Sequence, residues 1–450
     1  MNEYPLLRAA RHGSVFARRA GGAITVATFL RDVAALAALL PARGHVVNLC
    51  RDRYRFAVGF AAALCRRQVN LLPPHDAADR LDQLSQDYPG VYYLADTAPQ
   101  SGSAVVTDPS TFHYPPELTH GSAPLAVPCF PADQPAAVLF TSGSTGRPLP
   151  HGRSWGELVN SALAAGRRLG IASLGEAALL GTVPHQHSYG LESLLMLALQ
   201  HGLVLHAGRP FYAADIVAEL AAAPRPRMLV TTPVHLRLLL AEPGDLPAVD
   251  LLLSATAPLS ADLAREAEAR FAVALYEIYG CSEAGQIAAR RTAMTEEWRC
   301  LDGIVLRQDP AGTWASGPPI AVETLLSDVI QLHDPERFLL QGRIADLVNV
   351  AGKRSSIAHL NFHLNAIDGV VDGAFFAGEN DAAGVGRLMA FAVAPGLSAE
   401  HILAALRRRI DPAFLPRPLH LVAALPRNTL GKLPREQLLR LLDQAREISS

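Results

Sequence analysis

Residues 138–148 read Val-Leu-Phe-Thr-Ser-Gly-Ser-Thr-Gly-Arg-Pro. An apolar run that suits a β-strand leads directly into six small residues that carry hydroxyl groups or are glycine. Glycines let backbone N–H groups approach an anion closely, and the hydroxyl groups add further donors. The stretch lacks the P-loop pattern G-x-x-x-x-G-K-S/T, and an ordinary Gly/Ser turn is the simpler alternative. We interpret it as a strand that ends in an anion-binding loop.

Strand-like and helical stretches alternate on both sides of this loop. The strand–helix pairs are residues 46–49 and 56–67, 228–231 and 234–240, and 251–254 and 261–271. Such alternation predicts an α/β protein whose strands are mostly parallel. The segment 95–135 is rich in Pro, Ser and Thr, and we expect it to be a loop or linker.

The length of 450 residues predicts roughly two to three domains. From about residue 343 the pattern changes to a glycine-containing turn, short strands and two helical stretches at 399–410 and 435–448. This last part carries a net charge of +3, and the rest of the chain −5. We therefore predict an α/β fold with a large N-terminal multi-layer domain over residues 1–341. A small α+β C-terminal domain would follow over residues 342–450.

The composition excludes several classes of protein. Half of the residues are apolar and 18% are charged, which supports a packed core and argues against disorder. With 40 basic and 42 acidic residues, the net charge of −2 argues against a protein that binds nucleic acid. The five cysteines form no C-x-x-C pair, so we expect neither a disulfide framework nor a cysteine zinc site.

The apolar runs, the first residues and the cysteines indicate where the protein is located. The apolar runs 33–40 and 56–65 are shorter than the ~20 residues of a membrane span. The first residues lack a basic segment followed by an apolar core, so we expect no signal peptide. Scattered cysteines, odd in number, fit a reducing compartment. We expect a soluble, cytoplasmic protein with no membrane span.

Lysine is rare in this chain. Lys353 and Lys432 are the only lysines among the 40 basic residues. Arginine is a planar fork, whereas lysine is a compact point charge on a flexible stem, so the two are not interchangeable. A lysine in such a chain is therefore a candidate for a role that arginine cannot fill. For each lysine alone, a solvated surface group is the alternative.

Three further motifs carry groups suited to chemistry. Residues 279–285 read Tyr-Gly-Cys-Ser-Glu-Ala-Gly, and one carboxylate in a glycine-flanked loop suits Mg²⁺, although it could simply cap a helix. Residues 342–354 read Gly-Arg-Ile-Ala-Asp-Leu-Val-Asn-Val-Ala-Gly-Lys-Arg. Residues 426–435 read Pro-Arg-Asn-Thr-Leu-Gly-Lys-Leu-Pro-Arg and present Lys432 in a glycine loop just ahead of a helical stretch.

Taken in order, the four motifs resemble those of the adenylate-forming superfamily over residues 136–435. The superfamily comprises acyl-CoA synthetases, adenylation domains of nonribosomal synthetases and luciferases. The resemblance implies an enzyme that uses ATP and Mg²⁺ to convert a carboxylic acid into an acyl-adenylate and then into a thioester. It also implies that the C-terminal domain is mobile.

The resemblance implies roles for individual residues at the nucleotide. The 254–259 segment would pack against adenine, Tyr279 would flank it, and Asp328 and Arg343 would contact the ribose. Ser282 would lie near the α-phosphate, and Arg354 would face a phosphate. The implied nucleotide-binding set is Thr141, Ser142, Gly143, Ser144, Thr145, Gly146, Ala255, Thr256, Ala257, Tyr279, Gly280, Ser282, Asp328, Arg343 and Arg354. The implied Mg²⁺ ligands are Glu283 and Thr145.

Lys432 matches the family's catalytic lysine, and the resemblance places Glu283 and His187 beside it in the catalytic set. A carboxylate attacks the α-phosphorus while pyrophosphate leaves, so positioning and cationic stabilisation supply most of the catalysis. The chain departs from the family at three places. Leu149 stands where a lysine usually follows the phosphate loop, Ser327 replaces a glycine, and Ala345 occupies the hinge position.

Residues 183–190, Val-Pro-His-Gln-His-Ser-Tyr-Gly, stand where the family lines its acyl pocket. Two histidines at i and i+2 could suggest a metal, but no third ligand is evident. They would rather gate the acyl site or hydrogen-bond a polar substrate group. The implied substrate-binding set is His185, His187, Tyr189, Gly190, Thr232, His235 and Gly280. Gly352 would let a pantetheine arm pass close to the backbone.

The compact chain, with its segments 185–190 and 254–258, looks like the ligases of aryl polyene and xanthomonadin pathways. These load a hydroxybenzoate or similar aryl acid on an acyl carrier protein, and arginines 407–409 offer an acidic carrier a complementary charge. An acyl-CoA or aryl-CoA ligase is the nearest alternative. A non-catalytic nucleotide-binding regulator is a third hypothesis, which Leu149 and Ala345 support and Glu283 and Lys432 oppose. No G-x-S-x-G elbow of a serine hydrolase is present.

Overall fold

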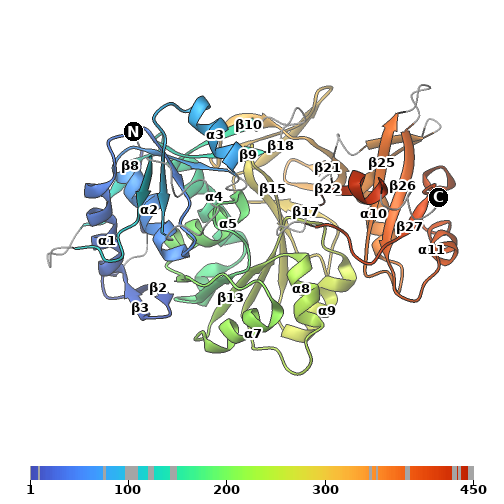
Figure 1. The fold of residues 1–450 in the computed structure, drawn as a ribbon, viewed down its shortest axis with the longest axis horizontal. Coiled ribbons are helices and arrows are strands. Elements are labelled where there is room, and N and C mark those ends of the chain that lie inside the picture. Colours follow the sequence, from blue (N-terminus) through green and yellow to red (C-terminus); the bar gives the residue numbers. More distant parts are fainter. Residues whose placement is uncertain are drawn as a thin grey trace.

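The computed structural model describes residues 2–8, 11–73, 78–96, 110–119, 126–141, 149–343, 347–350, 353–380, 386–427, 433 and 437–443. Figure 1 shows a large body formed by most of the chain and a smaller body at one side formed by the C-terminal residues. Within these ranges, no helix is both long and apolar enough to cross a membrane.

A six-stranded sheet forms one layer of the large body. Its order is β10 (Leu149–Ser154), β9 (Pro135–Thr141), β5 (Val69–Leu72), β4 (His45–Asn48), β6 (Tyr92–Ala95) and β7 (Thr111–His113). All neighbours are parallel except β9 and β10. The middle strands β4, β5 and β6 are mostly apolar and largely buried, as expected for strands that are covered on both faces.

The prediction that 95–135 is only a loop is wrong in part. Within it lie β7 and β8 (Cys129–Pro131), and β8 pairs with β1 (Glu3–Pro5) at the N-terminus. These strands are three residues long, so the alternation of apolar and polar residues that marks a strand is too short to stand out.

An eleven-stranded sheet forms the second layer. Its order is β21 (Asp328–Asp334), β22 (Arg337–Arg343), β17 (Trp298–Cys300), β16 (Gly285–Arg290), β15 (Leu275–Cys281), β14 (Leu251–Ser254), β13 (Arg227–Thr231), β11 (Ala178–Gly181), β12 (Val204–His206), β2 (Val15–Arg19) and β3 (Gly22–Thr25). The run from β15 to β2 is parallel, as predicted, whereas both edges are antiparallel.

Helices cover and separate these sheets (Figure 1). They are α1 (Val26–Leu39), α2 (Arg53–Cys65), α3 (Ala78–Asp87), α4 (Trp155–Arg168), α5 (Ser188–Gly190), α6 (Leu197–His201), α7 (Ala213–Ala222), α8 (Pro233–Leu240) and α9 (Ala261–Phe271), with a π-helical turn over Leu191–Met196. Local signals explain their starts. Ser154 and Glu157 form a capping box at α4, and the Ser260 side chain caps α9.

The smaller body has its own core. It contains β23 (Leu347–Val350), β24 (Lys353–Ser356), α10 (Ile357–Asn365), β25 (Asp372–Asn380), β26 (Gly386–Val393), α11 (Ala399–Leu406) and β27 (Leu419–Leu421). Leu360, Phe375, Ala390 and Ile402 are buried together there. Three antiparallel strands, β18 (Val305–Asp309), β19 (Gly312–Gly317) and β20 (Ile320–Leu325), form a separate small sheet on the large body. The domain boundary at residue 342 stays a prediction.

The parallel centre of the large sheet decides where a site can form. The carboxyl ends of β11, β13, β14 and β15 meet at one edge of the sheet. The loops beyond these ends contain the 183–190 segment, Thr232, the 254–259 segment and residues 280–284. In open α/β sheets, ligands bind at this edge. The topology therefore brings most of the predicted acyl-binding and adenine-binding residues to one place.

Candidate active site

The predicted ribose and adenine residues meet in the structure. Tyr279, in β15, donates a hydrogen bond of 2.6 Å from its hydroxyl group to Oδ2 of Asp328, the first residue of β21. The Tyr279 ring packs against the rings of Trp298 and Phe338, with centroids 5.7 Å and 5.6 Å away. Both members of the hydrogen-bonded pair are largely buried, so the Asp328 carboxylate is held in a fixed orientation.

The turn after β15 holds the predicted magnesium ligand. A Cβ added at Gly280 would lie 2.4 Å from the carbonyl oxygen of Gly285, so only glycine fits there. The Glu283 side chain is half-buried and hydrogen-bonds the thiol of Cys281. Burial, and secondarily the charge of Glu283, raise the pKa of the Cys281 thiol. A partly accessible carboxylate in a tight turn fits a hard cation such as Mg²⁺.

The predicted adenine-binding segment leaves β14 in a strained conformation. Thr256 has a φ of +80°, which a β-branched residue rarely adopts. The segment is anchored beyond this point, because Leu259 N–H donates to Oε1 of the buried Glu277 at 3.2 Å. Glu277 also binds Arg290 at 2.8 Å. Strain that the surroundings hold in place is common at ligand-binding sites.

The 183–190 segment is tightly packed against its neighbours. Tyr189 is buried, and its hydroxyl group donates to the carbonyl oxygens of Thr231 and Leu253 at 3.3 Å and 3.1 Å. Its hydroxyl group thus bridges the ends of β13 and β14. A Cβ added at Gly190 would lie 2.0 Å from the Pro184 carbonyl oxygen, so glycine is required there. The ring of Tyr189, rather than its hydroxyl group, is left for the predicted contact with substrate.

The two histidines of this segment differ in their surroundings. His185 is fully buried, its Nε2 lies 2.8 Å from the carbonyl oxygen of Cys50, and its ring packs on Phe56 at 4.3 Å. Burial and the charge of Arg53 lower the pKa of His185 to about 3. Because the His185 side chain is fully buried by its neighbours, a structural role is favoured over the predicted contact with a substrate. His187, directly before α5, is half-buried and stays the candidate for a gate or a catalytic contact.

His235 and Thr232 belong to one hydrogen-bonded group at the start of α8. Nδ1 of His235 lies 2.9 Å from Oγ1 of Thr232 and 3.1 Å from Oγ1 of Thr182. Phe211 meets the imidazole edge-to-face at 5.4 Å. Burial lowers the pKa of His235, which favours a neutral imidazole. The predicted pocket residues Thr232 and His235 therefore contact each other, and Thr182, directly after β11, joins them.

Two charged residues that the sequence did not single out organise the same edge. Glu192 is buried in the π-helical turn and accepts hydrogen bonds from Ser161 Oγ (2.6 Å), Ser188 Oγ (2.9 Å) and the Gln286 N–H (3.2 Å). It thereby joins the acyl-pocket segment to β16. Turns of this type are frequent at functional sites. A carboxylate inside an otherwise apolar run, Leu191–Met196, is the signal that could have revealed it.

Arg53 is the second such residue. Its guanidinium, in α2, donates to the carbonyl oxygens of His206 (2.8 Å), Gly208 (2.6 Å), Gly181 (3.0 Å) and Val183 (3.4 Å). These carbonyl groups lie at, or shortly after, the last residues of β11 and β12. Arg53 therefore connects helix α2 to the edge of the large sheet that carries the predicted pocket. Complete burial lowers the pKa of Arg53 to about 10. An arginine in the apolar stretch 53–65 was the available signal.

Part of the predicted site lies outside the described residues. This applies to the phosphate loop, the thiol-tunnel glycine and the catalytic lysine, namely Ser142, Gly143, Ser144, Thr145, Gly146, Gly352 and Lys432. The backbones of Thr141, Arg343 and Arg354 belong to β9, β22 and β24, and their side chains also lie outside the description. Ala255 is buried and Ser282 is half-buried. The structure thus describes the adenine, ribose and acyl parts of the predicted site.

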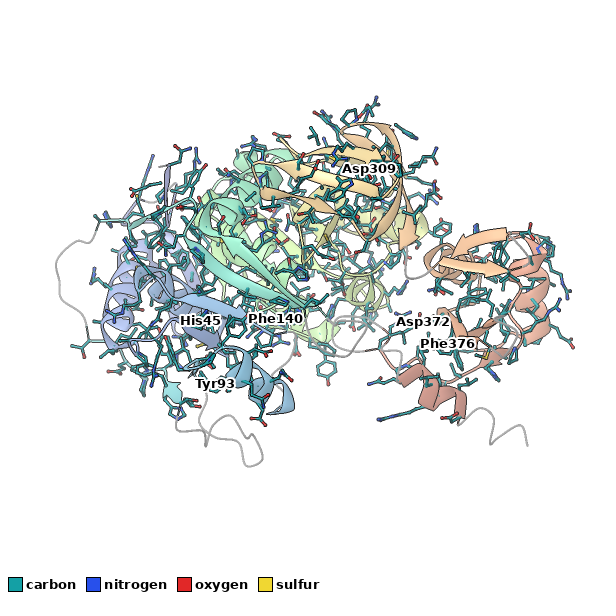
Figure 2. The ribbon with its side chains drawn as sticks, turned by 90° about the horizontal axis from the view of Figure 1, so that it is seen from above. His45, Tyr93, Phe140, Asp309, Asp372 and Phe376 are labelled. Carbon is teal, nitrogen blue, oxygen red and sulfur yellow. The ribbon has the colours of Figure 1, made fainter. Side chains whose placement is uncertain are left out.

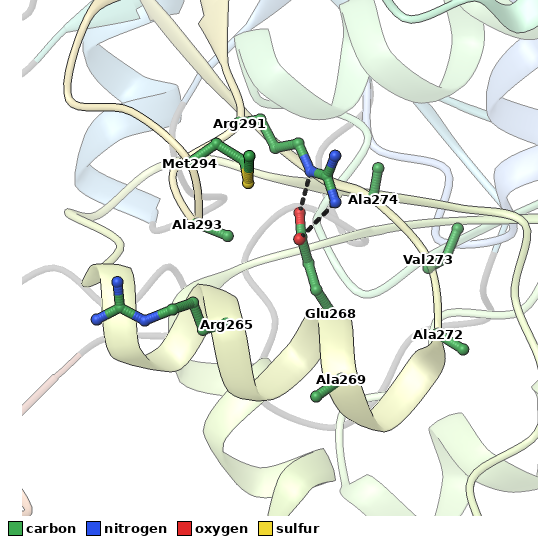
Figure 3. A pocket seen from close by; sticks show the side chains of 9 residues that line it. All are labelled: Arg265, Glu268, Ala269, Ala272, Val273, Ala274, Arg291, Ala293 and Met294. Atoms are coloured by element: carbon green, nitrogen blue, oxygen red, sulfur yellow. Dashed lines mark hydrogen bonds and ion pairs between the residues drawn. The ribbon is translucent and has the colours of Figure 1, made fainter.

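A surface hollow of about 440 Å³ lies elsewhere (Figure 3). It is bordered by α9, by residues 272–274 before β15 and by Met294. Glu268 accepts two hydrogen bonds from Arg291, at 2.7 Å and 2.8 Å, across this hollow. Because the hollow adjoins the amino end of β15, it is at the opposite edge from the predicted residues. Among the described residues, no group of three or more His, Cys, Asp or Glu side chains could hold a metal.

Comparison with known proteins gives a consistent result. The model of a family described as AMP-binding enzyme matches residues 12–307. A 4-coumarate–CoA ligase from Rhodobacter capsulatus is 30% identical over 303 residues, which cover 66% of this chain and 74% of that protein. A 4-chlorobenzoate–CoA ligase from Arthrobacter sp. is 30% identical over 172 residues, which cover 35% of this chain and 31% of that protein.

Solved structures agree at the level of the fold. ATP-bound MatB from Rhodopseudomonas palustris has a TM-score of 0.81 at 20% identity, with 96% of each chain covered. O-succinylbenzoate coenzyme A synthetase from Bacillus subtilis, in complex with ATP and magnesium ion, has a TM-score of 0.81 at 19% identity. That match covers 97% of this chain and 100% of the other. The predicted α/β fold with a large N-terminal and a small C-terminal part is confirmed.

Proposed function

The chain belongs to the family of AMP-binding enzymes, and from this premise we propose which acid it activates and which thiol it loads. The family's chemistry is ATP-dependent activation of a carboxylic acid to an acyl-adenylate, followed by formation of a thioester. We propose that the acid is a hydroxybenzoate or a closely related aryl acid. We further propose that the acceptor is the phosphopantetheine thiol of an acyl carrier protein, and that the reaction takes place in the cytoplasm.

The first step would join acid and nucleotide. An oxygen of the carboxylate attacks the α-phosphorus of ATP, a new P–O bond forms, and the bond to pyrophosphate breaks. Lys432 would stabilise the negative charge that develops on the phosphoryl oxygens. Glu283, with Thr145, would hold Mg²⁺, which would neutralise phosphate charge. In the second step the thiol sulfur attacks the acyl carbonyl carbon, AMP leaves, and the thiol proton passes to solvent.

The hydrogen bond between Tyr279 and Asp328 is the single observation that supports this proposal most. The two residues stand 49 positions apart, and the family resemblance assigns one to adenine and the other to the ribose. Their direct contact beside the Gly280 turn gives a nucleoside an aromatic ring and an oriented carboxylate in one place. An aspartate in this setting suits ribose hydroxyl groups as hydrogen-bond donors.

The aryl acid is supported by the residues around the acyl segment and by two relatives. Tyr189, His235 and Phe211 offer aromatic surface near the ends of β13 and β14. Aromatic side chains favour flat apolar ligands. Relatives of the chain are named for coumarate and chlorobenzoate, both aryl acids. These names support an aryl acid more than an aliphatic one.

The acyl carrier protein is supported by charge. Arg407, Arg408 and Arg409 follow α11 and are exposed, as are Arg417 and Arg440. A carrier protein is acidic, so such a surface would guide the encounter. CoA also carries phosphates, and the relatives are named as CoA ligases, so CoA is the second candidate acceptor. The five cysteines are free thiols, which suits a cytoplasmic enzyme.

ATP–pyrophosphate exchange across benzoic, hydroxybenzoic, cinnamic and fatty acids tests the first step. We expect exchange with hydroxybenzoates and its loss in Lys432→Ala, which should still bind ATP. Near wild-type exchange in Lys432→Ala would contradict the assignment of the lysine. No exchange with any acid would favour a nucleotide-binding regulator. Holo-carrier protein and CoA, offered together and analysed by mass spectrometry, would then identify the acceptor.

A further inference from the structure

The buried carboxylate of Glu192 accepts hydrogen bonds from three separate parts of the chain. Ser188 Oγ, in the predicted acyl segment (residues 183–190), donates to Oε1 at 2.9 Å. Ser161 Oγ, in α4, donates to Oε2 at 2.6 Å, and the N–H of Gln286, in β16, donates to the same oxygen at 3.2 Å. Because Glu192 is only 1% exposed, these hydrogen bonds lie in a low-dielectric interior and hold their partners strongly.

The Gln286 end of this network lies at the base of the turn that carries Glu283. Gln286 follows Glu283 by three residues and is paired with Gly280 where β15 and β16 meet. A second hydrogen bond, from Nε2 of Gln286 to Oγ of Ser193 at 2.8 Å, accompanies the one to Glu192. Two consecutive residues of the π-helical turn therefore hold the strand that supports the predicted Mg²⁺ ligand.

A buried arginine packs against the start of the same strand. A Cβ added at Gly285, the first residue of β16, would lie 2.4 Å from Nη1 of Arg153. Gly285 has a φ of +76°, a conformation that favours glycine. Nη2 of Arg153 donates to the carbonyl oxygen of Pro319 at 3.0 Å, which holds the guanidinium in place. The base of the Glu283 turn is thus closely packed and has little room to shift.

The Ser188 end of the network lies between two residues of the predicted acyl pocket. His187, directly before Ser188, is half-buried and is the candidate for a gate or a catalytic contact. Tyr189, directly after it, is buried. Because adjoining residues move together, the hydrogen bond from Ser188 to Glu192 also restricts where His187 can lie.

The third donor anchors the carboxylate to a central helix. In Figure 2 the green segment that contains α4 and α5 lies in the middle of the large body, between the segments labelled at His45 and at Asp309. Helix α4 begins with a capping box, and Nε1 of its first residue, Trp155, donates to the carbonyl oxygen of Tyr4 at 3.0 Å. The Ser161 contact therefore attaches Glu192 to a well-anchored helix.

We propose that Glu192 is a positioning residue for adenylation, because its carboxylate holds the acyl segment in a fixed place relative to the Glu283 turn. The acid would bind at the first and the magnesium–nucleotide at the second, so this inference rests on the proposed function. An attacking carboxylate oxygen must lie close to the α-phosphorus and in line with the leaving group. A misplacement of about 1 Å reduces such a rate by up to about a hundredfold. Glu192 acts through Ser188 and Gln286.

Two serine variants separate positioning from stability, because each removes one hydroxyl donor from the same carboxylate. Ser188→Ala releases the acyl segment, whereas Ser161→Ala releases α4. We expect the maximum rate of ATP–pyrophosphate exchange, at saturating aryl acid and ATP, to fall about tenfold in Ser188→Ala. Ser161→Ala should stay within about twofold of wild type, although both variants should lose similar stability. Ser188→Thr, which keeps the hydroxyl group, should recover most of the rate.

Thioester formation from supplied acyl-adenylate gives an independent measurement. In the adenylate the acid and the α-phosphate are already joined covalently, so their relative position no longer depends on Glu192. Ser188→Ala should therefore form the thioester within about twofold of the wild-type rate. Glu192→Leu, which removes both acceptor oxygens, should slow exchange at least as much as Ser188→Ala. Adding Ser188→Ala to Glu192→Leu should then have little further effect, since the serine acts through this carboxylate.

Exchange by Ser188→Ala within about twofold of wild type would overturn the proposal. Equal losses in Ser188→Ala and Ser161→Ala, together with lower melting temperatures, would also overturn it, since the network would then be only structural. Failure of the proposed function looks different, because wild type would then exchange pyrophosphate with no acid. A wild type that exchanges, matched by Ser188→Ala, contradicts only the positioning role of Glu192.

Discussion

The hydroxyl group of Tyr279 lies 2.6 Å from a carboxylate oxygen of Asp328, and this hydrogen bond crosses from the centre of the large sheet to its edge strand. Strands β16, β17 and β22 lie between the two residues in the strand order. The rings of Trp298 and Phe338, on two of these intervening strands, pack against the Tyr279 ring. A nucleoside that binds beside this pair would find the carboxylate already oriented.

Tyr279→Phe should raise the KM for ATP about tenfold in pyrophosphate exchange while the protein stays folded. The ring and its packing are kept, and the hydrogen bond that is lost involves a charged group, which is worth about 1.5–3 kcal/mol. Tyr93→Phe is the control, because Tyr93 is a buried tyrosine in β6 of the other sheet and its hydroxyl group is bonded to Ser85 and Leu81 of α3. An unchanged KM in Tyr279→Phe would mean that Asp328 needs no such support.

Arg53→Met should lower the free energy of unfolding by about 3 kcal/mol or more, because several buried carbonyl oxygens lose their donor. Arg53→Lys should recover only part of this loss, since one ammonium group cannot reproduce a planar fork. Urea denaturation measures both. Arg307→Met, at an exposed arginine paired with Glu323, serves as the control and should leave the midpoint nearly unchanged. Equal midpoints for wild type and Arg53→Met would contradict a stabilising role for the hydrogen bonds from Arg53 to these carbonyl oxygens.

Local sequence patterns predicted much of this fold, and long-range contacts explain what they missed. The helix expected over 261–271 and the strand expected over 251–254 have those bounds in the structure. Each has a clear apolar pattern, and a capping serine precedes the helix. The antiparallel edges were not expected, because strand pairing depends on partners far away in the chain. The pair β17–β22 joins residues near 298 to residues near 338.

The site follows the same rule. The motifs predicted site residues in several loops, and the parallel strands bring several of these loops to one edge of the sheet. Arg53 was missed because its carbonyl partners are 128–155 residues away, and its place at the start of an apolar helical stretch does not reveal which groups it binds. His185, by contrast, was singled out by its motif, but its surroundings were not predicted. Its motif position suggested contact with substrate, yet its burial beside Phe56 depends on a helix more than 120 residues earlier.

The buried His185 should make stability depend on pH. Its pKa is lowered to about 3, chiefly by burial, so the folded state keeps it neutral while the unfolded state protonates it near 6.5. Because the unfolded state binds the extra proton, stability is lost as pH falls from 6.5 toward 3, by about 1.4 kcal/mol per pH unit. Urea denaturation at pH 5 and pH 7 of wild type and His185→Gln would measure this difference. A wild-type slope that equals the slope of His185→Gln would contradict it, and the exposed His12→Gln serves as control.

Gly190→Ala should disrupt the acyl segment because its Cβ would lie 2.0 Å from the carbonyl oxygen of Pro184, a backbone atom that cannot swing aside. We expect about 1–3 kcal/mol of destabilisation and a rise in KM for the aryl acid that exceeds any rise for ATP. Gly152→Ala, in β10, is the matched control, since a Cβ there meets no atom within 4 Å. Chemical denaturation and pyrophosphate exchange would measure both effects. Equal behaviour of the two alanine variants would show that the segment tolerates the added methyl group and that its close packing does not shape the acyl pocket.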